Sequence, residues 1–374
     1  MEKLFTPVQA GDLKLPNRVI MAPLTRSRSP GGIPDGMNAL YYTQRASAGL
    51  IISEGTPVSE QGQGYADVPG LFRRASLDGW KQVTDEVHRA GGKIVAQLWH
   101  VGRLSHTSLQ PYGGQPVAPS EVVADATSFI IDRNGNGVRA PASDPRPLTE
   151  EGIQAIIRDF GLAARNAMNA GFDGVEIHAA NGYLIEQFLK SSTNLRTDKY
   201  GGSLENRARF LLEVTKAVCN AAGAGKTGVR ISPTATVNDI FEPDPQPLYD
   251  YIVRELAGYG LSFMHIVEGQ PAGDRNHCPE GKPFDYRRLR KTYQDNGGKG
   301  IWMVNNGYTR QMAIDAVESG EADAVSFGRD YISNPDLFER LRYNLEITPS
   351  NRDTYYGGDA EGYVDYPKAQ YEPA

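Results

Sequence analysis

Cysteine is nearly absent from the chain, and its scarcity excludes two classes of protein. Cys219, within a helical pattern, and Cys278, within a loop, are the only cysteines in 374 residues. Two cysteines are too few for a disulfide framework or a zinc cluster. The composition is therefore typical of a protein from a reducing compartment.

Long apolar runs and an excess of positive charge are also missing. No segment approaches the roughly 18 apolar residues that span a bilayer, and the N-terminal residues 1–7 lack the apolar core of a secretory signal. The formal net charge of −6 provides no basic field for nucleic acid or anionic membranes. We therefore expect a cytoplasmic protein that binds neither, although single arginines remain free to bind a small anion.

Several catalytic motifs are absent as well. No GxGxxG fingerprint follows a predicted strand, and no His-Glu-x-x-His occurs. No lysine stands at a strand end, where an aldolase would form its Schiff base. Residues 223–227 resemble the end of a phosphate-binding P-loop, but they precede a strand instead of following one.

The chain does contain eight short apolar runs rich in Val and Ile. Each is bounded by Gly, Asn or Asp, and most are followed by a helical pattern. Runs without polar alternation are typical of parallel strands covered by helices on both faces. Eight such units predict one α/β domain over residues 1–374, a closed (β/α)8 barrel of the TIM type. The runs span residues 18–23, 49–54, 93–98, 174–178, 228–232, 262–267, 300–305 and 323–327.

Capping residues delimit the helices in the second half of the chain. An N-cap hydroxyl followed by glutamates in the first turn predicts a helix start, and a glycine after the apolar pattern predicts its end. The predicted helices start at Thr149, Ser203, Pro247, Thr309 and Asn334-Pro335, and the first four end near Gly171, Gly223, Gly258 and Gly320.

The first half is interrupted by a segment rich in Gly and Pro. Residues 100–148 form an insertion between the third strand and its helix, and they contain a hairpin pattern that turns at Asn134-Gly135. An unstructured loop of this length is uncommon, so we expect a small subdomain over the barrel mouth. Residues 353–374, rich in Tyr, Gly and Pro, predict an irregular C-terminal arm.

One strand end gathers three polar side chains within six residues. The run 174–178 ends in His178, and Asn181 and Tyr183 follow. Two of them can donate hydrogen bonds to an oxygen and the third can give up a proton, which indicates a site that polarises a carbonyl or nitro group. The alternatives are a barrel-interior histidine bonded to a neighbour and an asparagine that caps the next helix.

The ends of the seventh and eighth strands predict an anion site. Gly307 and Gly328 follow these strands, and Arg329 is next in the chain. Glycine lets backbone N–H groups approach an anion, and this barrel position often holds phosphate. Tight turns are the alternative reason for both glycines. Arg230, inside an apolar run, needs a partner; we expect either an ion pair with Glu176 or a contact with a ligand.

The motifs as a set resemble those of the old yellow enzyme family, and they are most similar to bacterial N-ethylmaleimide reductases and glycerol trinitrate reductases. The resemblance covers nearly the whole chain. It is carried by Leu4-Phe5, residues 17–26, residues 178–188, residues 201–207, Tyr356-Gly357-Gly358 and Glu361-Gly362-Tyr363.

The resemblance implies a noncovalent FMN on the barrel rim and NAD(P)H as the reductant. The activity it implies is reduction of the C=C bond of α,β-unsaturated carbonyl or nitro compounds, with nitrate esters and nitroaromatics as further substrates. Contacts to the isoalloxazine and ribityl chain fall on Pro23, Leu24, Thr25, Gly55, Gln97 and Arg230. Phosphate contacts fall on Gly307, Gly328 and Arg329. By the same resemblance, His178 and Asn181 bind the substrate oxygen and Tyr183 donates a proton. The residues that would line the pocket are Tyr65, Trp99 and Tyr356.

Two other functions stay open from the residues alone. A lyase or isomerase that needs no flavin could use the same anion site for a phosphorylated substrate. A noncatalytic protein that only binds or stores flavin would have the same cofactor contacts. The residues do not reveal the oligomeric state, the physiological substrate or the preference between NADH and NADPH.

Overall fold

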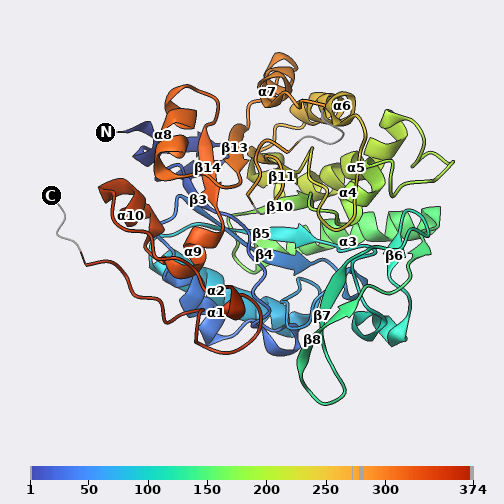
Figure 1. The fold of residues 1–374 in the computed structure, drawn as a ribbon, viewed down its shortest axis with the longest axis horizontal. Coiled ribbons are helices and arrows are strands. Elements are labelled where there is room, and N and C mark those ends of the chain that lie inside the picture. The colour runs from blue at the N-terminus through green and yellow to red at the C-terminus, as the bar shows by residue number, and fades with distance from the viewer. Residues whose placement is uncertain (1, 272, 278–281, 371–374) are drawn as a thin grey trace.

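The eight apolar runs form a closed barrel of parallel strands (Figure 1). The computed structural model describes residues 2–271, 273–277 and 282–370. Around the barrel the strand order is β10-β11-β12-β13-β14-β3-β4-β5, so the predicted (β/α)8 fold is confirmed. The strands are β3 (Val19–Met21), β4 (Leu50–Pro57), β5 (Ile94–Trp99), β10 (Gly174–Ala179), β11 (Thr227–Ile231), β12 (Phe263–Val267), β13 (Ile301–Asn305) and β14 (Ala324–Phe327).

Helices surround the barrel, and their starts follow the predicted caps. The hydroxyls of Thr149, Ser203 and Thr309 each accept a backbone N–H from the first turn of the following helix. The helices are α1 (Gly36–Thr43), α2 (Arg74–Arg89), α3 (Glu150–Asn169), α4 (Leu184–Leu189), α5 (Leu204–Ala222), α6 (Pro245–Ala257), α7 (Tyr286–Asp295), α8 (Arg310–Glu318), α9 (Arg329–Ser333) and α10 (Leu337–Tyr343). Single 3-10 turns occur at Lys3–Phe5, Pro30–Gly32, Glu60–Gly62, Thr107–Leu109, Pro111–Gly113, Ala224–Lys226 and Arg352–Thr354.

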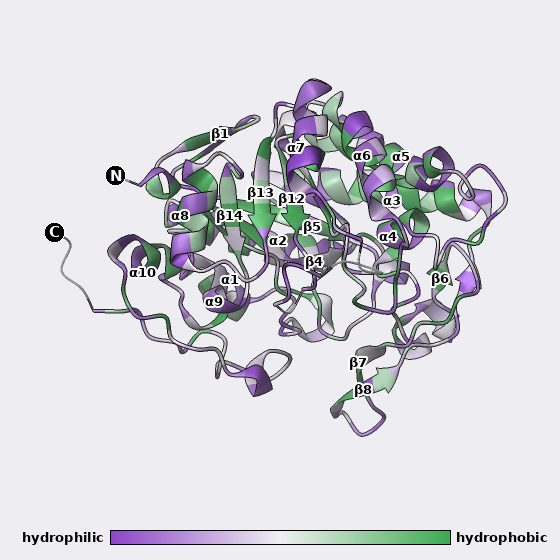
Figure 2. Cartoon of the chain, turned by 45° about the horizontal axis from the view of Figure 1, so that its top comes forward, coloured by the Kyte–Doolittle hydropathy of each residue, from purple (hydrophilic) through white to green (hydrophobic). Residues whose placement is uncertain are grey.

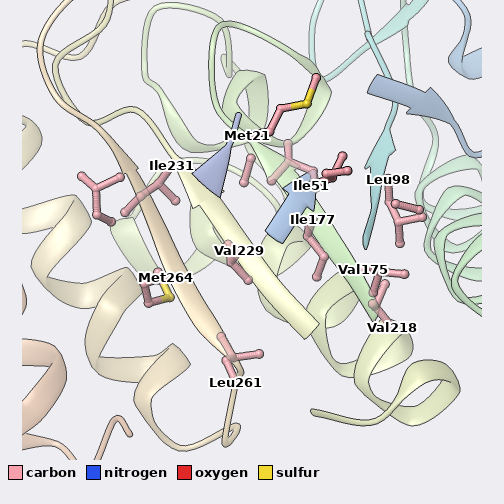
Figure 3. Packing of buried hydrophobic residues seen from close by; sticks show 14 of the residues in the cluster. Met21, Ile51, Leu98, Val175, Ile177, Val218, Val229, Ile231, Leu261 and Met264 are labelled. Atoms are coloured by element: carbon pink, nitrogen blue, oxygen red, sulfur yellow. The ribbon is translucent and has the colours of Figure 1, made fainter. Parts of the chain in front are cut away.

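Two separate apolar clusters hold this arrangement together. The larger one lies between the strands and the helices; Figure 3 shows Val175, Val229 and Val218 among its members. The smaller one contains Ile20, Ile52 and other strand residues. Alternate residues of a barrel strand point inward and outward, so the smaller cluster fills the interior of the barrel. Figure 2 shows the resulting hydrophobic strands at the centre of the molecule.

An N-terminal hairpin covers the amino ends of the barrel strands. It consists of β1 (Val8–Ala10) and β2 (Leu13–Leu15), and its apolar residues belong to the interior cluster. The Ser262 hydroxyl, just before β12, donates a hydrogen bond to the carbonyl of Ala10 at 2.7 Å. With this end closed by apolar side chains, ligand access is left to the carboxyl ends of the strands.

The insertion after β5 forms two small sheets. Strands β6 (Val117–Ala118) and β9 (Arg146–Pro147) pair in parallel, and β7 (Thr127–Ile131) and β8 (Gly137–Pro141) form an antiparallel hairpin. The hairpin turns through Asn134-Gly135, as the sequence predicts. In Figures 1 and 2 its tip extends beyond the barrel, and the C-terminal arm lies beside it.

Two buried arginines fasten the C-terminal arm to the segment that follows β3. Arg26 donates to the carbonyls of Tyr355 and Gly362 at 2.9 and 2.7 Å. Arg28 donates to the carbonyls of Asp359 and Glu361, both at 3.0 Å. Because five-donor guanidinium groups can satisfy several carbonyls at once, an arm without regular secondary structure is held against the barrel.

Among the helices of the described residues, none combines the length and the hydropathy that a membrane span requires.

A buried carboxyl below this arm makes stability depend on pH. Tyr42 donates to Oε1 of Glu54 at 3.2 Å, while Oε2 has no partner among the described residues. Burial raises the pKa of Glu54 from 4.5 to about 7. Between these two values the unfolded chain releases the proton while the folded chain keeps it, so rising pH favours unfolding.

We therefore expect Glu54→Gln to remove this pH dependence. The free energy of unfolding of the wild type should fall relative to that of the variant by up to about 3 kcal/mol between pH 4.5 and pH 8. Denaturant unfolding of both proteins, loaded with cofactor, at pH 4.5, 6 and 8 measures the difference. A difference that does not change with pH would contradict the assignment.

Candidate active site

A single large cavity opens at the carboxyl ends of the barrel strands. Its volume is about 1050 Å³, at the upper end of the range for small-molecule sites. Residues from all parts of the chain meet there, as the barrel topology requires. The predicted residues that line it are Pro23, Leu24, Thr25, Tyr65, Gln97, Trp99, His178, Asn181, Tyr183, Arg230, Gly307, Gly328, Arg329 and Tyr356.

Gly55 is the predicted site residue that does not line this cavity. It belongs to β4, and the indole of Trp99 packs against it: a Cβ at Gly55 would lie 2.6 Å from Cε3 of Trp99. Real Cβ contacts are never that short, so glycine is needed here to seat the indole. The predicted contact of Gly55 with the cofactor stays a prediction.

Aromatic rings form one wall of the cavity. The rings of Tyr65 and Trp99 stack with centroids 5.6 Å apart, and Trp99 meets Tyr183 edge to face at 4.9 Å. The ring of His178 meets Tyr183 at 5.0 Å. Offset and edge-to-face contacts are favourable for such rings, so the wall holds Tyr183 and His178 in defined orientations. Trp99 and Tyr65 therefore both pack and line the cavity.

His178 and Asn181 present unpaired polar groups to the cavity. Among the described residues, no hydrogen-bond partner is found for Nδ1 of His178 or for Oδ1 of Asn181, although both atoms are buried. Burial, with the positive charge of Arg230, lowers the pKa of His178 well below its ordinary value. His178 is therefore a neutral imidazole with one N–H donor. Buried polar groups are nearly always satisfied, so this pair is suited to bind a ligand.

The alternative readings of these two residues do not hold. Among the described residues, Nδ1 of His178 has no hydrogen-bond partner in the barrel interior, and α4 begins after Tyr183, whose N-cap position carries no side-chain hydrogen bond. Asn181, whose alternative role was to cap the next helix, adopts a left-handed conformation with φ of 58° and is not the N-cap residue of α4. Strained conformations of this kind cluster at functional sites.

Tyr183 lies in the same wall as a neutral phenol. Burial raises its pKa well above the ordinary value of 10, so the hydroxyl keeps its proton at neutral and moderately alkaline pH. The Tyr65 hydroxyl is 3.5 Å from the Tyr183 hydroxyl. A protonated donor next to the unpaired His178 and Asn181 is the arrangement that the sequence motif indicates.

A chain of buried hydrogen bonds crosses the cavity floor. Nε2 of Gln97 donates to Glu176 at 2.8 Å, and the other oxygen of Glu176 lies 2.6 Å from Nδ1 of His265. Nε2 of His265 lies 2.7 Å from the Ser326 hydroxyl. The amide nitrogen of Gln97 is thereby directed at Glu176, so its orientation is fixed before any ligand binds.

Of the two alternatives expected for Arg230, the ion pair with Glu176 does not form among the described residues. Glu176 is engaged by Gln97 and His265, and Nη2 of Arg230 donates instead to Oδ1 of Asn305 at 2.9 Å. Nε of Arg230 is buried without a partner among the described residues. His265 was not identified from sequence as the partner of Glu176, because it comes 89 residues later in the chain. The buried Arg230 cation is thus available to a ligand.

The predicted phosphate site lies at the turns after β13 and β14. Gly307 has a φ of 65°, so its turn alone favours glycine. Gly328 has a negative φ, and the nearest protein atom to a Cβ there would be 3.5 Å away. No internal contact requires that glycine, which fits the close approach of a ligand. Arg329 follows it and forms no ion pair with a carboxylate of the described chain.

These groups fit FMN along the length of the cavity. A neutral, planar ring system matches the aromatic wall and the Gln97 amide, and the phosphate matches Arg329 with the open backbone at Gly328. Arg230 offers a cation near the ring end. The volume leaves space for a second molecule beside the cofactor.

Other parts of the wall were not predicted residue by residue. Phe129 and Arg139 of the β7–β8 hairpin, Tyr308, Asn305 and Ser326 also line the cavity. The hairpin pattern and the strand ends were visible in the sequence, but which side chains face inward depends on how the insertion folds back. Residues 272 and 278–281, among them Cys278 of the predicted loop, lie outside the described residues.

Comparison with known proteins agrees with this site. The family model for the NADH:flavin oxidoreductase / NADH oxidase family matches residues 3–348. The chain is 44% identical to 12-oxophytodienoate reductase 7 of Oryza sativa subsp. japonica, over 97% of this chain and 94% of that protein. It is 40% identical to 12-oxophytodienoate reductase 2 of Arabidopsis thaliana, over 98% of this chain and 96% of that protein.

Solved structures show the same fold at high identity. Morphinone reductase, solved in complex with tetrahydroNAD, has a TM-score of 0.92 and 44% identity, with 98% of both chains covered. The old yellow enzyme homologue from Zymomonas mobilis has a TM-score of 0.91 and 39% identity, with 97% of this chain and 99% of that chain covered. The chain therefore belongs to the NADH:flavin oxidoreductase / NADH oxidase family, as an FMN-dependent NAD(P)H oxidoreductase of the old yellow enzyme type that reduces activated alkenes.

Proposed function

We propose that the chain reduces the C=C bond of cyclic and open-chain enones, with His178 and Asn181 as ligands of the carbonyl oxygen and Tyr183 as the proton donor. The observation that carries this proposal is the pair of unpaired polar side chains beside a protonated phenol on one cavity wall. FMN, when bound, supplies a hydride for the β-carbon.

His178 and Asn181 would act on the charge that forms at the substrate oxygen. As the β-carbon accepts a hydride, negative charge develops on the carbonyl oxygen. Two donors aimed at that oxygen stabilise the transition state more than the ground state. His178 suits this role because, as a neutral imidazole, it donates through one N–H and transfers no proton in the resting state.

Tyr183 would complete the reaction at the α-carbon. The electron pair of the enolate forms the new C–H bond with the Tyr183 proton, the O–H bond of Tyr183 breaks, and the negative charge passes from the substrate oxygen to the Tyr183 oxygen. Solvent then returns a proton to Tyr183, and the Tyr65 hydroxyl at 3.5 Å lies beside this route. Positioned proton donors contribute roughly 10²- to 10⁴-fold to rates.

A redox titration of the purified protein tests the proposal. We expect a yellow protein whose colour bleaches under anaerobic NADPH or NADH and returns when 2-cyclohexenone is added. Reduced protein that is reoxidised by oxygen but not by the enone would contradict the substrate class. Comparing NADH with NADPH in the first step also gives the preference between the two reductants.

Nitro compounds and nitrate esters extend the proposed substrate range. A nitro oxygen accepts hydrogen bonds at the same place as a carbonyl oxygen, and the cavity volume of about 1050 Å³ does not restrict the ligand to small enones. Nitroalkenes would follow the same steps, because the nitro group activates the adjacent C=C bond.

We further propose that the chain works as one domain in which the 100–148 insertion and the C-terminal arm from residue 353 frame the entrance. Phe129 and Arg139 of the insertion line the cavity together with Tyr356 of the arm. The Arg139 guanidinium lies 5.3 Å from the centre of the Tyr356 ring, within cation–π range. The low cysteine content supports a cytoplasmic location.

The two other functions considered from sequence are not supported. A flavin-free lyase or isomerase would not account for the aromatic wall and the full-length match to a flavin oxidoreductase family. A protein that only stores flavin would have no use for the unpaired His178 and Asn181 beside Tyr183.

A further inference from the structure

A buried carboxylate lies directly behind the turn that carries Asn181. Glu186, in the first turn of α4, is fully buried together with Lys190, and Nζ of Lys190 is 3.1 Å from its Oε1. Neither side chain lines the cavity. A buried ion pair is in general no more stabilising than apolar residues of similar size. Stability alone therefore does not explain why Glu186 and Lys190 are buried here.

The turn in front of Glu186 has an unfavourable backbone. Asn181 and Gly182 both have positive φ, 58° and 82°. Only glycine adopts this region freely, and an asparagine there needs support from its surroundings. The Asn181 carboxamide has no partner for its Oδ1 among the described residues, so only the backbone determines where this side chain points.

Glu186 is connected to both backbone amides of this turn, to one directly and to the other through a hydroxyl. The N–H of Gly182 donates directly to Oε2 at 2.6 Å. The N–H of Asn181 donates to the Ser232 hydroxyl at 2.8 Å, and that hydroxyl donates to Oε1 of Glu186 at 2.7 Å. From the other side, the Asn238 carboxamide donates to the carbonyl of Asn181 at 2.8 Å.

Two further donors hold the carboxylate itself in place. They are the Tyr249 hydroxyl at 3.0 Å from Oε1 and the Lys190 ammonium. Neither of them touches the turn. Four donors therefore converge on one buried carboxylate, two of which lead to the backbone of the substrate-binding loop.

We propose that Glu186 is a positioning residue, whose carboxylate holds the Asn181-Gly182 turn in its left-handed conformation and so directs the Asn181 carboxamide at the substrate oxygen. This rests on the proposed function, because it assumes that Asn181 binds that oxygen. Lys190 supplies the counter-charge next to this buried carboxylate.

The test measures binding of p-hydroxybenzaldehyde to the FMN-loaded protein by the change in flavin absorbance. Ser232→Ala cuts the link to the Asn181 amide but leaves the ion pair intact. We expect the Kd to rise roughly 10- to 100-fold, as small misplacements of binding groups do, with unchanged flavin content. In steady state, KM for the enone should rise more than kcat falls.

Tyr249→Phe is the matched control. It removes one hydrogen bond to the same carboxylate without any connection to the turn, so it should lower Tm but leave the Kd of the probe unchanged. If Tyr249→Phe and Ser232→Ala weaken binding equally, Glu186 has only a structural role and the proposal is overturned.

The double variant Glu186→Leu/Lys190→Met removes both charges and the acceptor that holds the turn. Leucine is used because a glutamine at position 186 could still accept from the Gly182 N–H. Glu186→Leu alone leaves a buried ammonium without its partner and is expected to unfold easily. The double variant removes both charges, so Tm should recover relative to the single variant while probe binding stays weak. Binding as tight as wild type in the double variant would overturn the proposal.

Asn181→Ala distinguishes the two levels of inference. One outcome is that Asn181→Ala raises the Kd of the probe while Ser232→Ala and the double variant leave it unchanged. In that case the positioning role assigned to Glu186 is wrong, and the proposed substrate site stands. If Asn181→Ala has no effect on the Kd, the proposed substrate site itself fails.

Discussion

Tyr183→Phe is expected to slow enone reduction by roughly 10²- to 10⁴-fold while reduction of the flavin by NAD(P)H remains normal. The variant keeps the ring that packs against Trp99 and His178 but loses the only hydroxyl assigned to the α-carbon. Stopped-flow measurement of the two half-reactions gives both rates separately. An unimpaired oxidative half-reaction would show that the proton has another source.

Tyr65→Phe is the control for this result, and pH provides a second check. The Tyr65→Phe ring can still stack on Trp99, so this variant should slow enone reduction much less than Tyr183→Phe does. If both variants slow the reaction equally, the assignment of Tyr183 as the proton donor is wrong. Because burial holds the pKa of Tyr183 well above 10, the donor stays protonated, and enone reduction should not decline between pH 7 and pH 9 from loss of this proton.

Arg329→Ala is expected to weaken FMN binding by roughly 30- to 1000-fold, the range for losing one partner of a charge-assisted contact worth about 2 to 4 kcal/mol. The guanidinium makes no ion pair within the described chain and lies at the cavity end with Gly307 and Gly328. Titration of apoprotein with FMN and with riboflavin measures the effect. Riboflavin has no phosphate, so its affinity should hardly change.

Arg74→Ala removes an equal charge from the protein surface and controls for the effect of the protein's net charge on FMN binding. Its side chain is 93% exposed on α2 and is not among the residues that line the cavity. It should leave the ratio of FMN to riboflavin affinity unchanged. If Arg329→Ala weakens riboflavin as much as FMN, the residue supports the fold of the cavity and does not bind the phosphate.

The fold was predictable because its signals are local. A run of apolar residues between Gly, Asn or Asp gives a strand wherever it stands, and a hydroxyl at Thr149 or Thr309 caps the helix that follows it in the chain. Not every element was predicted by its bounds: α1, α2, α4, α7, α9, β6, β9 and the β1–β2 hairpin were not named from the sequence. The β1–β2 hairpin has strands of three residues, and α9 has five, too short for a periodic pattern to appear.

The start of α6 shows the limit of such local signals. The sequence offers Pro245 and Pro247, and either can occupy the first turn of a helix. The prediction placed the start at Pro247, whereas the helix begins at Pro245. The choice depends on packing, because Pro245 and Asp250 are buried against the rest of the chain, and helix ends differ by one or two residues for such reasons.

The candidate site also has a part that the sequence predicts and a part that only the structure gives. His178, Asn181 and Tyr183 come from one strand end, so their nearness follows from the chain itself. The partners of Glu176 do not follow from the chain: the sequence left open whether Arg230 pairs with Glu176 or contacts a ligand, and the structure pairs Glu176 with His265 and Gln97. Arg230, Gln97 and His265 stand on neighbouring strands at similar depth, and only side-chain geometry decides among them.

By itself, the amino-acid sequence determined that eight strands alternate with helices, that polar and aromatic side chains stand at the carboxyl ends of those strands, and that the mouth carries an insertion and an arm. These follow from periodicity and from residues close together in the chain. Only the tertiary structure decided that the indole of Trp99 covers Gly55, that Arg230 bonds Asn305, and that Glu186 stands behind Asn181. Such contacts join residues from separate strands and loops, and they depend on distances of a few ångströms that no spacing along the chain encodes.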